Sequence, residues 1–158
     1  LENKGIHIYE IERGGDVTYH GPGQITAYPV FNLDYFGKDI HNFLRKLEEV
    51  IIGLLWDFAV FGRRRPGFTG VWIEKSKIAS IGIAIKNWIT YHGLSINIKN
   101  DDLENFGLIR PCGIETNMTS LESVLGHDIK INEVKSSLVN KFKERFSKTL
   151  LKIPALIS

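Results

Sequence analysis

The strongest structural signal in the sequence is Lys77-Ile78-Ala79-Ser80-Ile81-Gly82-Ile83-Ala84-Ile85, a mainly apolar stretch near the middle of the chain. Bulky apolar residues alternate with smaller ones along it, which is the period of a β-strand. A second apolar run covers residues 89–98, and only Lys86-Asn87-Trp88 separates the two runs. So short a connection favours an antiparallel hairpin. We therefore expect two long strands, paired with each other, at the centre of the fold.

Helices are expected to cover this hairpin. Between Asp39 and Phe58, apolar residues spaced by three and four form one stripe, which we assign to the core without any chemistry. A second helix is expected from Asn132, a favourable N-cap, to about Phe146. Further strands are expected over residues 6–11, 25–31, 60–61 and 69–74. Helices on an antiparallel-rich mixed sheet make an α+β (mixed α/β) fold.

Length and composition exclude several classes of protein. The 158 residues fit one domain spanning residues 1–158, and the 43% hydrophobic and 24% charged residues are typical of a soluble globular protein. No apolar run approaches the roughly 18–20 residues of a membrane-spanning helix. A net charge of +2 is too mild to indicate nucleic acid. One cysteine excludes an internal disulfide, and the five histidines show no zinc-ligand spacing. We expect a cytoplasmic protein with neither a membrane nor nucleic acid as partner.

Lys77 and two glycines are unusual within strands. Strict alternation places Lys77 on the face of the apolar residues at 79, 81, 83 and 85, where burying an ammonium is costly. Either Lys77 reaches water at the strand end, as most lysines do, or it serves a site. Gly82 and Gly93 permit close approach to the sheet by a ligand, a backbone segment or a packing helix.

Cys112 lies in Arg110-Pro111-Cys112-Gly113, where proline and glycine predict a rigid turn. A free cysteine is commonly a small buried hydrophobe. A cysteine on a turn is instead a nucleophile when a nearby cation lowers its thiol pKa. Lys77 is a candidate for that cation, because the hairpin between the two residues can bring the turn back beside the strand. We expect their side chains to lie in contact, directly or through water.

A glycine-rich stretch precedes the hairpin and reads Arg13-Gly14-Gly15-Asp16-Val17-Thr18-Tyr19-His20-Gly21-Pro22-Gly23-Gln24. It matches neither the phosphate-binding loop nor the dinucleotide-binding pattern, which disfavours a nucleotide site. It is either a tight connection between strands or part of a site. Arg13, Asp16, Thr18 and His20 give it more polar groups than a turn requires.

Four segments, taken in order, resemble the octanoyltransferases of lipoate biosynthesis, also called lipoyl(octanoyl) transferases. The glycine-rich stretch resembles the leading signature of that family, and Lys77-Ile78-Ala79-Ser80-Ile81-Gly82 resembles the segment with its catalytic lysine. His92-Gly93-Leu94-Ser95-Ile96-Asn97 and Pro111-Cys112-Gly113 resemble the remaining motifs. The resemblance extends over about residues 6–146. Only twelve residues precede Arg13, so the family's N-terminal segment is expected to be missing.

The resemblance implies a fold shared with biotin and lipoate protein ligases. It implies transfer of an octanoyl group from octanoyl-acyl carrier protein to a lysine amine of lipoyl domains, in 2-oxoacid dehydrogenases and the glycine cleavage H protein. Cys112 would hold the octanoyl group as a thioester, and Lys77 would lower the thiol pKa and pass protons. No metal, ATP or other cofactor is implied, because the incoming thioester is already activated. The implied substrate-binding residues are Arg13, Gly14, Gly15, Asp16, Val17, Thr18, Tyr19, His20, Ser80, Ile81, Gly82, Gly93, Leu94 and Ser95.

Two other functions remain open. An ATP-dependent lipoate or biotin-type protein ligase would share the fold, but it would not require Cys112 and would need a nucleotide site. A non-catalytic module that binds lipoyl domains or acyl carriers would need neither Lys77 nor Cys112.

Two further features bear on substrates. The apolar face of Ile81, Ile83 and Ile85 suits an eight-carbon chain. The basic loop Arg63-Arg64-Arg65, with Lys75 nearby, either helps to dock acidic partners or is a solvated loop without a role.

Overall fold

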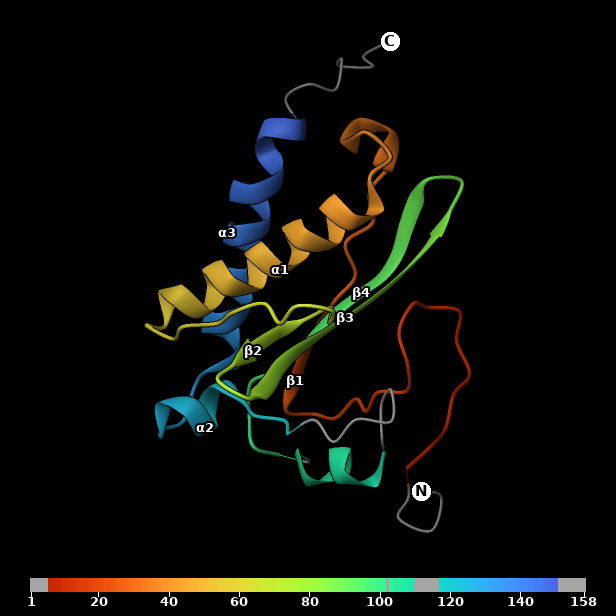
Figure 1. The fold of residues 1–158 in the computed structure, drawn as a ribbon. Coiled ribbons are helices and arrows are strands. Elements are labelled where there is room, and N and C mark those ends of the chain that lie inside the picture. Colours follow the sequence, from red (N-terminus) through yellow and green to blue (C-terminus); the bar gives the residue numbers. More distant parts are fainter. Residues whose placement is uncertain (1–5, 102, 110–116, 151–158) are drawn as a thin grey trace.

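The structure is a computed structural model of the chain, and it describes residues 6–101, 103–109 and 117–150. At its centre lies an antiparallel sheet with the strand order β1-β4-β3-β2 (Figure 1). The strands are β1 (Gln24–Ala27), β2 (Val71–Ile73), β3 (Ser76–Lys86) and β4 (Ile89–Asn97). The helices are α1 (Ile40–Asp57), α2 (Leu121–Leu125) and α3 (Ile131–Leu150), with the 3-10 helices η2 (Leu33–Phe36) and η3 (Leu103–Leu108).

The predicted central hairpin is confirmed. β3 and β4 pair continuously from Ala79 opposite Ile96 to Lys86 opposite Ile89. The two residues of the turn, Asn87 and Trp88, both have positive φ, at 50° and 63°. A two-residue turn with this geometry matches the right-handed twist of the strands that it joins.

Helices α1 and α3 pack together over one face of the sheet (Figure 1). Helix α1 begins where the sequence predicts, because an Asp39 carboxylate oxygen accepts the Asn42 N–H at 2.9 Å and caps the helix. Except for Ile40, which is exposed, its predicted apolar stripe is buried or partly buried against α3 and the sheet, which confirms the α+β fold. The buried members from the two helices are Phe43, Leu47, Val50, Ile51, Leu54, Leu55, Val134, Leu138 and Phe146. Among the described residues, no helix has both the length and the apolar character that crossing a bilayer requires.

Two predicted strands are wrong. Residues 6–11 run as coil, and none of the described strands pairs with them. Alternation alone does not make a strand, because the backbone N–H and C=O groups also need a ladder partner. Residues 60–61 are coil as well, and the nearby pairing is a single bridge between Arg63 and Trp72.

Several predicted elements have different ends. β1 stops at Ala27, two residues before Pro29, whose ring nitrogen carries no hydrogen for the ladder. β2 covers only Val71–Ile73 of the expected 69–74. α3 begins at Ile131, so Asn132 lies inside its first turn and is not the N-cap.

Candidate functional site

A cavity of about 650 Å³ lies over the sheet face opposite α1 and α3. Thr26, Ser95 and Ser80 form one row of its floor, since they are direct partners across β1, β4 and β3. Gly93 and Gly82, which also face each other, form the next row. The walls come from residues 13–20, the loop residues 67–69, η3, and the segment 117–118.

The structure brings most of the predicted substrate-binding residues together. Of those that it describes, all but Gly14 and Tyr19 line this cavity. The Gly14 N–H donates to the Ile83 carbonyl at 2.8 Å. Tyr19 packs edge-on against Phe106, with ring centroids 5.5 Å apart. Both residues therefore support residues of the cavity wall without lining the cavity themselves.

Backbone segments lie directly over Gly82 and Gly93. Of the three explanations for these glycines (a ligand, a backbone segment or a packing helix), the structure supports the backbone segment. A Cβ added to Gly82 would lie 2.7 Å from the Gly14 carbonyl oxygen. A Cβ added to Gly93 would lie 2.1 Å from the carbonyl oxygen of Ala27. The helices pack on the other face, so the close approach belongs to the glycine-rich segment and to the end of β1.

Two side-chain amides, of the half-buried Gln24 and the buried Asn97, connect the glycine-rich segment to the sheet. Gln24 Oε1 accepts a hydrogen bond from His20 Nδ1 at 3.0 Å, and Gln24 Nε2 donates to Asn97 Oδ1 at 3.0 Å. The buried Asn97 amide donates in turn to the Thr119 carbonyl at 3.0 Å. Gln24 and Asn97 thus connect the wall formed by residues 13–20 to the segment that contains Thr119.

A β-bulge decides the side on which Lys77 lies. Val71 pairs with Ala79, but the next residue, Trp72, pairs with Lys77, so Ile78 is an extra residue on β3. An extra residue reverses the alternation of side chains. The face predicted for Lys77 is therefore wrong, because Lys77 lines the cavity while Ile78 and Ala79 are both buried in the core. Its predicted catalytic role stays a prediction.

The expected acyl-binding face also needs correction. Ile83 packs within the core cluster beneath the helices, and Ile85 packs against that cluster. Ile81 and Leu94 border the cavity but are buried members of the same core. The alternating isoleucines therefore pack toward α1 and α3 and do not form an exposed groove for an acyl chain.

The surroundings of Lys77 are well defined. Its Nζ lies 5.0 Å from the centroid of the Trp72 ring, a cation–π arrangement. Its backbone N–H donates to the Asn117 carbonyl at 2.8 Å, and its carbonyl accepts the Thr119 N–H at 3.0 Å. Residues 117–119 thus run beside Lys77 as a short parallel bridge.

Cys112 lies outside the described residues, so its contact with Lys77 stays a prediction. The described residues on either side of that segment, Ile109 and Asn117, both line the cavity.

Sequence reasoning missed several residues of the cavity. Thr26 could have been found, because it alternates with the buried Ile25 on β1. The η3 residues give no periodic signal, since a 3-10 helix of one or two turns has no recognisable period. His92 has a φ of 58°, an uncommon conformation for a residue other than glycine. The lining residues that were missed include Tyr28, Phe68, Thr69, His92, Leu103, Glu104, Phe106, Ile109, Asn117 and Met118. In the described part of the chain, no three His, Cys, Asp or Glu residues are grouped as metal ligands.

The three arginines of the basic loop differ in their contacts. Arg64 is paired with the carboxylates of Glu48 and Glu49. Arg63 is exposed and donates to the Glu74 carbonyl at 2.8 Å. Arg65 is exposed and lies 4.7 Å from the centroid of the Phe68 ring. Docking of acidic partners stays a prediction, and Arg63 and Arg65 are the arginines of this loop that could serve it.

Comparison with known proteins shows which family the sequence matches. Residues 1–143 match the family model described as the lipoyl protein ligase A/B catalytic domain. An octanoyltransferase of Thermoanaerobacter sp. (strain X514) is 50% identical over 144 residues, which are 90% of this chain and 62% of that protein. An octanoyltransferase of Syntrophobacter fumaroxidans is 42% identical over 164 residues, which cover 100% of this chain and 72% of that protein. The chain thus spans less than two thirds of the length of the first of these relatives.

A solved structure of a protein from T. acidophilum with bound lipoic acid, provisionally assigned as a lipoate protein ligase, superposes with a TM-score of 0.77. The two sequences are 17% identical, and the match covers 92% of this chain and 61% of that one. At this identity the likeness supports the fold alone, and it confirms the lipoate-ligase-like architecture. On the family model and the curated relatives together, the chain belongs to the lipoyl protein ligase A/B catalytic domain family and, within it, to the octanoyltransferases.

Proposed function

We propose that this chain transfers an octanoyl group from octanoyl-acyl carrier protein to a lysine amine of a lipoyl domain, through a thioester on Cys112. One observation carries the proposal: Lys77 lines the cavity and is hydrogen-bonded through its backbone to the segment that follows the cysteine motif. Membership of the octanoyltransferase family supports the same reaction.

Chain length supports a thiol within reach of Lys77. Cys112 is three residues from Ile109 and five from Asn117, and both of these line the cavity. An extended chain spans at most roughly 3.3–3.6 Å per residue, so three residues reach at most about 10–11 Å. The Asn117 carbonyl is bonded to the Lys77 N–H, which limits the separation of the two proposed catalytic residues.

In the first step, the Cys112 thiolate attacks the thioester carbonyl of the acyl carrier. The new carbon–sulfur bond forms at Cys112, the bond to the carrier's sulfur breaks, and the carrier thiolate takes a proton from the Lys77 ammonium. The positive charge on Lys77 lowers the pKa of the Cys112 thiol and so maintains the thiolate before the attack. One difficult transfer becomes two easier ones.

In the second step, the neutral amine of the acceptor lysine attacks the Cys112 thioester. The amide bond forms, the bond to Cys112 breaks, and the proton lost by the amine passes to the neutral Lys77. This returns the thiolate and the ammonium to their starting states. A lysine fits both steps because its amine can give up a proton and take it back.

The proposed substrate site is the cavity itself. The backbone and polar groups of residues 13–20, with Ser80 and Ser95, would bind the polar part of the thioester. The apolar residues on the opposite walls would contact the octanoyl chain, in place of the face of Ile81, Ile83 and Ile85. These apolar residues are Phe68, Leu103, Phe106, Ile109 and Met118.

Intact mass separates this proposal from the alternatives. The chain is mixed with octanoyl-acyl carrier protein, with and without ATP, and its mass is measured before and after addition of a lipoyl domain. We expect a gain of one octanoyl group without ATP, its loss to the lipoyl domain, and no gain in the Cys112→Ser variant. A mass gain in Cys112→Ser would place the nucleophile elsewhere. A parallel sample contains free octanoate and ATP in place of the acyl carrier, and acylation of the lipoyl domain only in that sample would indicate a ligase. Binding without acylation in any sample would indicate a non-catalytic module.

A further inference from the structure

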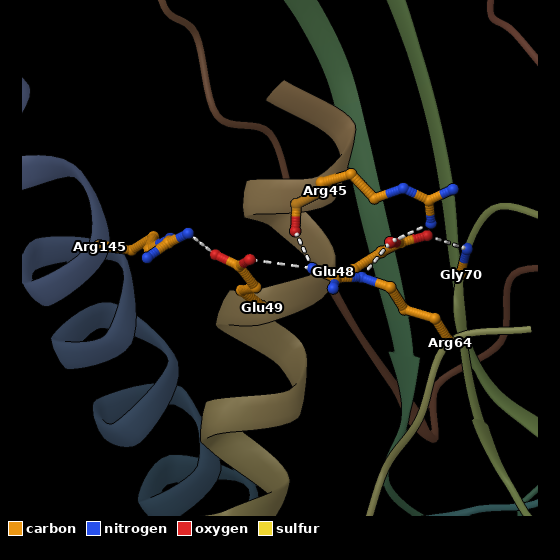
Figure 2. Close-up of polar contacts among 6 residues, drawn as sticks. All are labelled: Arg45, Glu48, Glu49, Arg64, Gly70 and Arg145. Atoms are coloured by element: carbon orange, nitrogen blue, oxygen red, sulfur yellow. Dashed lines mark hydrogen bonds and ion pairs between the residues drawn. The ribbon is translucent and has the colours of Figure 1, made fainter. Parts of the chain in front are cut away.

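A fully buried carboxylate lies behind the cavity wall. Glu48 of α1 is 0% exposed, and it accepts three hydrogen bonds (Figure 2). Arg45 Nη1 donates at 2.7 Å, Arg64 Nε at 2.8 Å, and the Gly70 N–H at 3.1 Å. A buried ionised carboxylate is costly unless every acceptor is satisfied, so these three donors define its position closely.

Its neighbour Glu49 belongs to the same network but does not contact Gly70. Glu49 accepts from Arg64 Nη2 at 3.0 Å and pairs with Arg145 of α3 (Figure 2). Arg64 also donates to the Arg45 carbonyl at 2.9 Å. The contact with the loop backbone at Gly70 is therefore specific to Glu48.

The Lys77 side chain packs directly against the backbone of Gly70. A Cβ added to Gly70 would lie 2.7 Å from Lys77 Cε and 3.3 Å from Lys77 Nζ. The φ of Gly70 is +133°, a conformation that side chains rarely adopt. The Trp72 ring provides a second contact for the same ammonium. Residues 67–69, directly before Gly70, line the cavity.

We propose that Glu48 is a positioning residue for Lys77, acting through the Gly70 N–H. The carboxylate fixes the Gly70 backbone, the backbone supports Cε and Nζ of Lys77, and the ammonium is thereby held in the cavity wall. This inference rests on the proposed function, because it matters for catalysis only if Lys77 acts on Cys112. Without the carboxylate, the loop backbone can shift and the ammonium loses its fixed place.

Alkylation of the single cysteine tests the inference without any substrate. The rate of reaction with iodoacetamide is measured against pH by intact mass, in the wild-type chain and in the variants Glu48→Gln, Glu49→Gln and Lys77→Met. Glu49→Gln is the matched control, since it removes the same charge from the next residue of the same helix but has no contact with Gly70. At pH 7 we expect alkylation to slow about tenfold in K77M and about three- to fivefold in E48Q, with E49Q close to wild type.

A double variant shows whether the effect passes through Lys77. E48Q in the K77M background should slow alkylation no further than K77M alone. A wild-type profile for E48Q, or the same slowing by E48Q with and without Lys77, overturns the inference while leaving the proposed function intact. An unchanged profile for K77M instead overturns the proposed role of Lys77, and this inference with it.

A shorter carboxylate replaces E48Q if that variant does not fold, as judged by circular dichroism. Glu48→Asp keeps the negative charge but withdraws the carboxylate by one methylene from its three donors, the Gly70 N–H among them. Slower alkylation in E48D supports the inference, and a wild-type rate in E48D overturns it.

Discussion

Gly82 and Gly93 face each other across the β3–β4 ladder, and each lies directly beneath a different backbone segment. The carbonyl of Gly14 covers the first, and that of Ala27 covers the second. Neither glycine is among those with positive φ, so the reason for glycine at both positions is space and not backbone conformation. Two positions without a side chain allow the glycine-rich segment and the end of β1 to reach the cavity floor.

Alanine at these two positions should have different effects. In Gly93→Ala the new methyl group meets the Ala27 backbone at 2.1 Å and Pro29 Cδ at 2.6 Å, so β1 must move. We expect the free energy of unfolding to fall by roughly 1–3 kcal/mol, as in other overpacked cores. In Gly82→Ala the new methyl group meets the coil at Arg13 and Gly14. That coil can shift more easily, so the loss of stability should be smaller.

Urea unfolding followed by tryptophan fluorescence measures the stability of both variants. Octanoyl transfer kinetics measure the effect of G82A on substrate binding. G82A should raise KM, because it displaces Arg13 from the cavity wall. A larger loss of stability in G82A than in G93A would contradict this account of the floor.

The sequence predicted those elements that depend on local pattern. Alternation and a short connection were enough for the β3–β4 hairpin, and an apolar stripe was enough for α1. The strand expected over residues 6–11 failed because pairing depends on a partner that no local pattern reveals. That segment 13–20 borders the site was implied by the resemblance and not by periodicity, and the resemblance did not separate Gly14 and Tyr19 from the residues that line the cavity.

The face of Lys77 could not be predicted, since one bulge reverses the alternation on which the prediction depended. Glu48 was also hidden, because it lies within an otherwise apolar helical stripe and its donors come from distant residues. Such errors arise where tertiary contacts override a regular local pattern.

A cross-helix ion pair should make part of the stability depend on pH. Hydrogen bonds from Lys141 at 2.8 Å and from Ser137 at 2.5 Å lower the pKa of the Asp57 carboxyl. A carboxyl whose pKa is lower in the folded state stabilises the fold above its unfolded pKa, and the contribution is lost as pH falls through the folded value. Asp57→Asn should therefore cost roughly 0.2–1 kcal/mol at pH 7, as expected for a partly exposed pair, and nothing once the carboxyl is protonated in acid.

Urea unfolding at pH 7 and in acid checks this. Glu144→Gln is the control, because Glu144 lies farther from the Lys141 ammonium, at 3.4 Å, and its side chain is 64% exposed. A difference between wild type and D57N that persists unchanged in acid would show that the aspartate acts through packing and not through its charge.

Arg63 and Arg65 should contribute to docking of the acyl carrier, if the basic loop serves acidic partners. Reversing both charges (Arg63→Glu with Arg65→Glu) should slow association about three- to tenfold at low ionic strength, because steering by exposed charge acts on the on-rate. The effect should fade as salt shortens the Debye length to about 8 Å at physiological ionic strength. Stopped-flow association rates at two salt concentrations measure it. The control reverses Lys130, directly before α3, and Lys135 within α3, which packs on the other face of the sheet. Equal slowing there would exclude a specific role for the loop.

Arginine at position 77 should separate the two chemical steps. Lys77→Arg keeps a positive charge beside the thiol, but a guanidinium does not give up its proton at neutral pH and so cannot accept one from the incoming amine. We expect acylation of Cys112 to fall only a few-fold, whereas transfer to the lipoyl domain should fall by roughly 10²–10⁴, the usual contribution of a general base. The acyl-enzyme should therefore accumulate in K77R in the presence of acceptor, and intact mass with time would reveal it. Lys75→Arg, at the exposed turn between β2 and β3, is the control and should behave as wild type. Equal loss of acylation and transfer in K77R would mean that Lys77 contributes charge alone and that another group takes the proton from the amine.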